Sequence, residues 1–142
     1  MARTLLCEIV TPEAILYTNE VQMVIAKTTI GEVGILPLHA PIVSILAPGD
    51  LRLRHGDQAS DWEQFSVSGG YLQVHEDKVI VLADNAVQVS QIDASRLKES
   101  AALIEARLAE LPADAADERD EMIRDLDWAK VQIRSAEKRS AR

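Results

Sequence analysis

The first ninety residues alternate between apolar and polar positions over short stretches, a pattern typical of half-buried β-strands. The alternation covers residues 21–26, 51–54 and 72–75, and an unbroken apolar run follows at 79–82. In the first stretch Val21, Met23 and Ile25 alternate with Gln22, Val24 and Ala26. Short strands at close intervals, separated by turn residues, predict an antiparallel sandwich or barrel.

Glycine and proline mark where these strands end. All six glycines and four of the five prolines lie in residues 1–90, so this part should consist of many short elements joined by tight turns. The pair Gly69-Gly70 lies between two apolar stretches. Since glycine permits a bulge or a sharp bend, we expect the chain to pass from one sheet to the other there.

The remaining residues change to a helical period. Two sets of apolar residues recur at spacings of 4, 3, 4 and 3, which predicts one narrow apolar stripe on each of two helices. The sets are Leu97, Ala101, Ile104, Leu108 and Leu111, and then Met122, Leu126, Ala129, Ile133 and Ala136. The predicted fold is therefore α+β, with an antiparallel β-sandwich at 1–90 followed by an antiparallel two-helix hairpin at 91–142.

Local signals place the two ends of the first helix. Asp93 is a good N-cap for the first helix, with Ser90 as a competitor. Pro112 ends it, because proline disfavours the helical conformation of the residue before it.

The seam between the two apolar stripes offers mainly alanine and single aliphatic side chains, so two helices alone bury little surface. We expect a weakly closed hairpin that serves as a movable element.

Composition and charge narrow the function. The hydrophobic share is 47%, and the formal net charge is 15 − 23 = −8. An acidic chain repels phosphate backbones and anionic lipid, which argues against nucleic-acid and membrane-surface binding. A single cysteine excludes an internal disulfide and favours a reducing compartment. With no run long enough to span a bilayer and no signal-peptide core, we expect a soluble intracellular protein without membrane insertion.

Catalytic and metal-binding patterns are missing from the sequence. Cys7 lies in an apolar stretch, where a buried thiol is expected. His39, His55 and His75 have no metal-ligand spacing, and the glycines at 31 and 34 lack the lysine and helix of a phosphate-binding loop. We therefore predict no catalytic residues, no metal and no cofactor.

Three segments together resemble the epsilon subunit of F-type ATP synthases, called delta in mitochondria. They are GEVGILPLHAP at 31–41, FSVSGGYLQV at 65–74 and VIVLAD at 79–84. The resemblance covers the whole chain, since the family also ends in a two-helix hairpin. It implies a non-catalytic rotor subunit of the central stalk that couples the gamma subunit to the c-ring.

The resemblance also implies contacts for particular residues. Glu32 and His39 correspond to the family's contact with the polar loops of the c-ring, on a stiff loop bracketed by glycine and proline. The alternative for His39 is that it only caps the turn between Pro37 and Pro41. The implied location is the cytoplasmic face of the cell inner membrane, peripheral through the complex.

In bacterial members of the family the hairpin is regulatory and blocks ATP hydrolysis when it extends into the alpha/beta catalytic head. The residues predicted to meet an acidic segment of the beta subunit form a basic tip, at Lys130, Arg134, Lys138 and Arg139. The alternative is that these basic residues only stabilise their own helix. The helix begins with acidic and ends with basic residues, and both interact favourably with the helix dipole.

Some members of the family bind ATP on the folded hairpin, which makes a nucleotide-sensing domain the alternative function. The family's ATP-binding motif is Ile/Leu-Asp-x-x-Arg-Ala. Asp93 and Arg96 match its aspartate and arginine, but Leu97 replaces its alanine. Trp128 and Gln132 stand where two arginines would hold the phosphates. We therefore expect ATP to be at most a weak regulatory ligand. Asp93 as a helix cap and Arg96 as a surface residue are the simpler interpretations.

Overall fold

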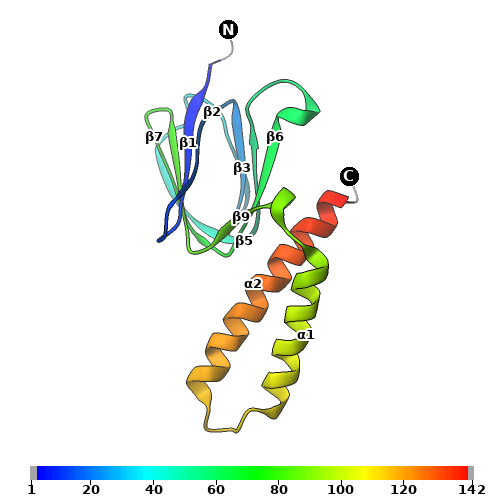
Figure 1. Cartoon of the computed structure of the whole chain (residues 1–142). Helices are drawn as coiled ribbons and strands as arrows, with labels where there is room; N and C mark the ends of the chain where they lie inside the picture. The colour runs from blue at the N-terminus through cyan, green and yellow to red at the C-terminus, as the bar shows by residue number, and fades with distance from the viewer. Residues whose placement is uncertain (1–2, 141–142) are drawn as a thin grey trace. The chain divides into compact units, whose positions relative to one another are not determined.

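The computed structural model describes the backbone of residues 3–140 and the side chains of residues 3–139. Residue contacts divide the chain into two compact units, of which the first ends at Gln88 and the second begins at Val89. The first unit contains nine strands (Figure 1). They are β1 (Leu5–Val10), β2 (Ile15–Val21), β3 (Met23–Thr28), β4 (Gly31–Ile35), β5 (Ile42–Arg54), β6 (Trp62–Val67), β7 (Gly70–His75), β8 (Lys78–Ala83) and β9 (Ala86–Gln88).

The strands form two layers that share the long strand β5. The first half of β5 pairs with β7, in a layer ordered β2-β1-β8-β7-β5. Its second half pairs with β3 and β6, in a layer that continues to β4 on one side and β9 on the other. The predicted sandwich is confirmed, with one difference: β1 and β8 run parallel, whereas the other pairs are antiparallel.

Aliphatic side chains fill the space between the layers. Alternate residues of the strands point inward, and Leu5, Cys7 and Ile9 of β1 are each at most 2% exposed. The alternation predicted at 21–26 has the wrong face beyond Val21. The chain bends at Gln22 between β2 and β3, which resets the period, so Val24 and Ala26 are buried while Met23 and Ile25 face outward.

The chain changes layers at Gly69-Gly70, as predicted. β6 belongs to the second layer and β7 to the first, and the two glycines adopt φ values of 125° and 134°. Gly70 also lies against β8. A Cβ atom added to it would stand 2.0 Å from the carbonyl oxygen of Leu82. Gly70 is therefore required both for its backbone conformation and for the close approach of two strands.

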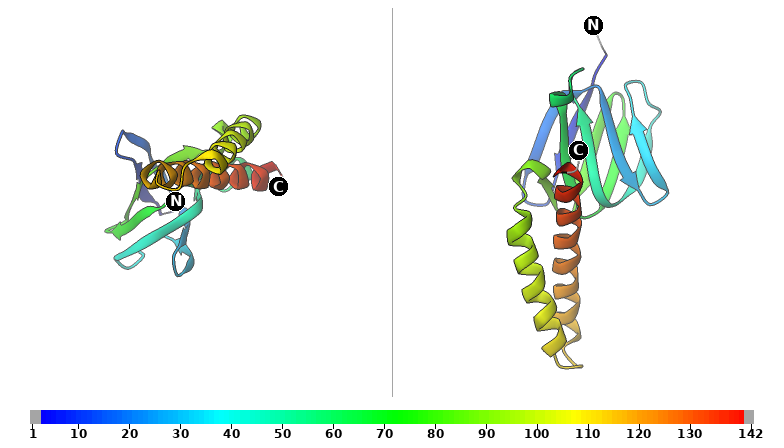
Figure 2. Two further views of the ribbon diagram at one scale, coloured as in Figure 1. Left: turned by 90° about the horizontal axis from the view of Figure 1, so that it is seen from below. Right: turned by 90° about the vertical axis from the view of Figure 1, so that its right-hand side faces the viewer.

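The second unit is the predicted helical hairpin. It begins with a short 3-10 turn, η2 (Val89–Gln91), and continues as α1 (Ala94–Glu110) and α2 (Ala116–Ser140). The helices lie side by side in opposite directions (Figures 1 and 2). Asp93 caps α1 by accepting a hydrogen bond from the Arg96 N–H at 3.2 Å. The helix ends before Pro112, with Leu111 in an extended conformation.

The seam between the helices is as thin as predicted. Its buried residues are Ala101 of α1 with Leu126 and Ala129 of α2, and the side chains packed against them are Leu97, Ile104 and Leu108. Val131 and Ser135 are buried as well, although neither belongs to the predicted stripe. Within the described residues, no helix is long and apolar enough to cross a membrane.

We predict that Gly70→Ala destabilises the first unit by about 3 kcal/mol or more, because the new Cβ clashes with backbone and the φ angle is unfavourable. Gly34→Ala is the matched control. Gly34 lies in β4 with open space around its Cα, so its replacement should cost little. Urea unfolding of the full chain measures both changes. Equal stabilities for the two variants would contradict this account of the layer change.

Candidate interaction surfaces

Among the described residues there is neither a metal-holding cluster nor a reactive thiol. They contain no group of three His, Cys, Asp or Glu side chains placed to hold a metal ion. The one thiol, Cys7, lies in the core, where burial first and then the neighbouring Glu8 raise its pKa to about 12. A thiol with that pKa carries no thiolate at neutral pH and is a poor nucleophile.

A continuous row of five apolar side chains crosses the outer face of the first layer. The registers place Val10 of β1 between Ile15 of β2 and Leu82 of β8. On β7, Tyr71 lies between Leu82 and Ile45 of β5. Ile15, Leu82, Tyr71 and Ile45 are 64%, 46%, 55% and 53% exposed. A contiguous exposed apolar surface of this kind marks a protein interface, and we call it the apolar row.

Sequence reasoning missed the apolar row because its members come from five strands. None of the strands carries a local motif for it. The best available signal was the run at 42–46, in which Val43 and Ile45 are apolar on what proves to be the outer face. Only the strand registers place Ile45 beside Tyr71 and join the separate positions into one surface.

The structure separates Glu32 and His39, which were expected on one loop. Glu32 lies in β4, next to the turn that joins β3 to β4, and His39 follows the other end of β4. The intervening strand is extended, at about 3.3 Å per residue, so the two side chains stand at opposite ends of it. Glu32 lies 3.9 Å from Arg52. The His39 Nδ1 lies 2.7 Å from the carbonyl oxygen of Ala40.

The loop that carries His39 is held by a carboxylate from elsewhere in the first unit. The backbone N–H of Leu38 donates to Oδ1 of Asp77, in the β7–β8 turn, at 2.7 Å. Arg3 donates to Oδ2 of the same group at 3.2 Å. The Leu38 N–H, and then Arg3, lower the pKa of Asp77. Leu38 has a φ of 70°, which is unfavourable for a leucine, so this bond maintains a strained loop.

Two ion pairs cross the hairpin. Lys98 of α1 lies 3.1 Å from Glu137 of α2, and Lys130 of α2 lies 3.8 Å from Glu105 of α1. All four side chains are more than half exposed, so each pair contributes at most about 1 kcal/mol. The ion pairs add to the thin apolar seam without making it strong.

The basic residues expected at a tip lie at the other end of the hairpin. Lys130, Arg134, Lys138 and Arg139 occupy the second half of α2, and all four are exposed. Because α2 runs antiparallel to α1, its C-terminal half returns to the start of α1 instead of lying at the turn. The Lys98–Glu137 pair shows this directly. The turn is flanked instead by the acidic beginning of α2.

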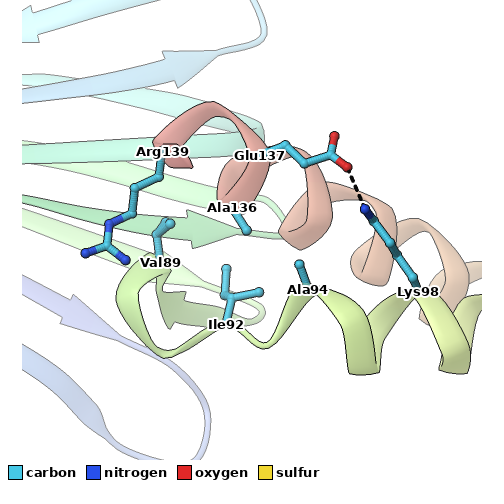
Figure 3. Close-up of a pocket in the computed structure, with 7 residues that line it drawn as sticks. All are labelled: Val89, Ile92, Ala94, Lys98, Ala136, Glu137 and Arg139. Carbon is cyan, nitrogen blue, oxygen red and sulfur yellow. Dashed lines mark ion pairs between the residues drawn. The ribbon is translucent and has the colours of Figure 1, made fainter. Parts of the chain in front are cut away.

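A cavity of about 350 Å³ lies at this open end of the hairpin (Figure 3). Its lining residues are Val89, Ile92, Ala94, Lys98, Ala136, Glu137 and Arg139. Asp93 and Arg96, the nucleotide-binding candidates, are exposed and do not line it. Asp93 is engaged as the helix cap, and Trp128 and Gln132 do not line the cavity either.

The chain is similar to known proteins over most of its length. Residues 4–89 match the family described as "ATP synthase, Delta/Epsilon chain, beta-sandwich domain". An ATP synthase epsilon chain of Desulforamulus reducens is 41% identical over 76% of this chain and 80% of its own length. One from Dehalococcoides mccartyi is 38% identical over 93% of this chain and 91% of its own.

Two solved structures share the fold. A chain in the cryo-EM structure of the Euglena gracilis mitochondrial ATP synthase, titled OSCP/F1/c-ring, has a TM-score of 0.69 at 20% identity, over 98% of this chain and 82% of that one. A chain in the Tetrahymena thermophila mitochondrial ATP synthase central stalk/c-ring has a TM-score of 0.61 at 16% identity, over 97% of each chain.

The matched family and relatives define a class of non-catalytic subunits, which act as parts of a larger enzyme. This chain belongs to the delta/epsilon family of ATP synthase subunits.

The Asp77 carboxylate accepts a hydrogen bond from the Leu38 N–H, so protonation of Asp77 should change the NMR signal of the Leu38 amide. Because the pKa of Asp77 is lowered in the folded chain from its ordinary value of 3.8, its stabilising contribution is complete above that value and is lost as pH falls through the lower folded value. We expect the NMR shift of the Leu38 amide to titrate with a midpoint below 3.8, the ordinary value.

Asp77→Asn should abolish the titration of the Leu38 amide. Asp57→Asn, at an exposed residue of the β5–β6 connection, is the control and should leave it unchanged. A midpoint at or above 3.8 in the parent, or a titration that persists in Asp77→Asn, would show that Asp77 does not hold this loop.

Proposed function

We propose that this chain is the epsilon subunit of an F-type ATP synthase and acts in the central stalk, where it couples the gamma subunit to the c-ring. Its membership of the family carries the proposal. The two solved structures support it, because one is of OSCP, F1 and the c-ring and the other is of the central stalk and the c-ring. As part of that complex the chain would lie at the cytoplasmic face of the cell inner membrane, peripherally.

The apolar row is the surface we assign to gamma. Ile45 and Tyr71 are each more than half exposed, and Val43 on the same outer face is 71% exposed. Leaving these side chains in water is unfavourable, at about 25 cal/mol per Å² of apolar area. A permanent protein partner removes that cost, whereas the polar loops of a c-ring would not. The first unit then acts as the anchor of the subunit.

We assign Glu32 and His39 to the c-ring, as two separate contacts. Glu32 is exposed and His39 is half-buried, and the two side chains stand at opposite ends of β4. A carboxylate at one end and an imidazole at the other are suited to pair with polar or basic loops of successive ring subunits. The Asp77–Leu38 bond would keep the second contact in position.

We propose further that residues 91–142 regulate ATP hydrolysis as a movable brake on the alpha/beta catalytic head. The thin seam and two exposed ion pairs support an element that rearranges at low cost. The exposed basic half of α2 would meet an acidic segment of the beta subunit. Asp93 is occupied as a cap, and Glu137 lines the cavity beside Lys98. These observations favour a brake that works without bound ATP.

The brake predicts a difference between the full chain and a chain stopped after Ser90. Titrated into a catalytic head that lacks epsilon, both should bind, but only the full chain should lower the rate of ATP hydrolysis. The double variant Arg134→Glu/Arg139→Glu should bind and inhibit less, while Arg124→Glu, in the acidic half of α2, serves as its control. Binding of both chains without inhibition would leave the coupling role and remove the brake.

The assignment of the apolar row predicts that Ile45→Asp weakens binding to gamma about tenfold or more, because a carboxylate would be buried in an apolar interface. The matched control is Ile30→Asp. Ile30 is 88% exposed in the β3–β4 turn, outside the row. Calorimetric titration of gamma with each full-length variant measures the effect. Equal affinities for the two variants would place gamma on another face.

A further inference from the structure

A second outer face of the sandwich carries positive charge around one indole ring. Arg52 and Arg54 of β5 project outward from the second layer, and the registers place them opposite Gln64 and Trp62 of β6. The guanidinium carbon of Arg52 lies 5.6 Å from the centre of the Trp62 ring, and that of Arg54 lies 5.8 Å from it. We call these four residues the Arg–Trp face.

The Arg–Trp face has more hydrogen-bond donors than acceptors. The Nε atom of Arg54 and the Nε2 atom of Gln64 are buried donors without a hydrogen-bond partner among the described residues, and Oε2 of Glu63 is a buried acceptor without one. Arginine offers only donors, and so does the indole of tryptophan. Because these two atoms are covered, an oxygen-bearing anion would be met by the other guanidinium nitrogens of Arg52 and Arg54.

Three of the neighbouring acids are engaged elsewhere, project inward or pair only weakly with this face. Asp61 is engaged in the β5–β6 connection, where it accepts from the Gln58 N–H at 3.0 Å and lies 4.0 Å from His55. Glu63 is opposite the buried Leu53, so it projects from the inner side of its strand. Glu32 reaches Arg52 only at 3.9 Å and is 67% exposed, which makes it a weak and displaceable partner.

The distribution of charge in the first unit makes this face distinctive. Residues 1–88 contain eleven acidic and five basic residues. Two of the five basic residues, Arg52 and Arg54, lie against the same ring. A unit that is otherwise acidic would repel an acidic partner everywhere except at such a face.

We propose that the Arg–Trp face binds an acidic peptide segment of another ATP synthase subunit through its carboxylates. The guanidinium groups are suited to carboxylate in a planar, two-bond geometry. The indole, together with Met23 and Ile25 on the adjacent strand β3, offers apolar surface for the peptide's methylenes. This face is separate from the apolar row, and Glu32 lies at its edge, 3.9 Å from Arg52. The identity of the partner as an ATP synthase subunit rests on the proposed function.

Trp62 itself reports binding. In the full chain carrying Trp128→Phe, Trp62 is the one remaining tryptophan, and its fluorescence can be titrated with hexaglutamate. We expect a saturable change with hexaglutamate and none with hexaglutamine, which has the same length without charge. Inorganic phosphate is the third titrant and should bind much more weakly, because it gains nothing from the apolar surface.

Variants then localise the effect. Arg54→Gln and Arg52→Gln should each weaken hexaglutamate binding at least about tenfold, and Arg54→Lys should lose affinity although it keeps the charge. Lys78→Gln removes one positive charge from the same unit, outside the Arg–Trp face, and should change little. Unfolding midpoints for every variant show whether it is folded. Equal losses for Lys78→Gln and Arg54→Gln would overturn the proposal in favour of unspecific attraction.

Two further outcomes would also overturn it. Phosphate binding as tight as hexaglutamate binding would make this an inorganic anion site. Self-association of the parent chain in sedimentation experiments, lost in Arg54→Gln, would make the occupant a second copy.

In the assembled ATP synthase, a photo-crosslinking residue at position 62 should attach to an acidic segment of another subunit. Failure of the chain to assemble would instead count against the proposed function. Assembly without any crosslink would count against this inference alone.

Discussion

The sandwich depends on one strand that belongs to both of its layers. β5 pairs with β7 through its first half and with β3 and β6 through its second, so a single stretch of thirteen residues connects the two sheets. The second crossing, at Gly69-Gly70, works only because glycine lets β7 approach β8 without a side chain. These two crossings bring the aliphatic inner faces together and define the two outer faces to which we assign partners.

The two outer faces differ in chemistry, although β5 contributes to both. Near its start, Ile45 extends the apolar row, and near its end, Arg54 lies beside Trp62. A partner that buries apolar area gains free energy roughly in proportion to that area. A partner held by charge gains less, but it is selected by its sign and geometry. If both proposals hold, one small unit would anchor to a permanent partner and still distinguish a second one.

The hairpin, unlike the sandwich, is held by a small number of weak contacts. Its seam is built from alanines and single aliphatic side chains, and its ion pairs are exposed to water. Separating the helices of such a hairpin costs little free energy. This would be unfavourable in an anchor, but it suits a regulatory element that has to move. The placement of its basic residues at the open end, beside the start of α1, matters for any such role, because these charges change neighbours when the helices separate.

Local patterns in the sequence were enough to predict both halves of the fold. The 4-3 spacing around Ala101 and Ala129 predicted the helical seam, Asp93 and Pro112 predicted where α1 begins and ends, and Gly69-Gly70 predicted the layer change. These features depend on residues close together in the chain. The prediction was wrong for β3, where a bend at Gln22 exchanged the inward and outward residues. An alternating pattern predicts the buried face only within one unbroken strand.

What the tertiary structure alone decided is which distant residues share a surface. The apolar row joins Ile15 to Ile45 through three intervening strands, and the parallel pairing of β1 with β8 that makes this possible leaves no local signature. The separation of Glu32 from His39 likewise depends on β4 being extended between them. By itself, the sequence determined the two helices, a strand-rich first half and the family resemblance, because all three are recorded in short segments. Registers between strands determined the surfaces, because they are set by packing across the whole sandwich.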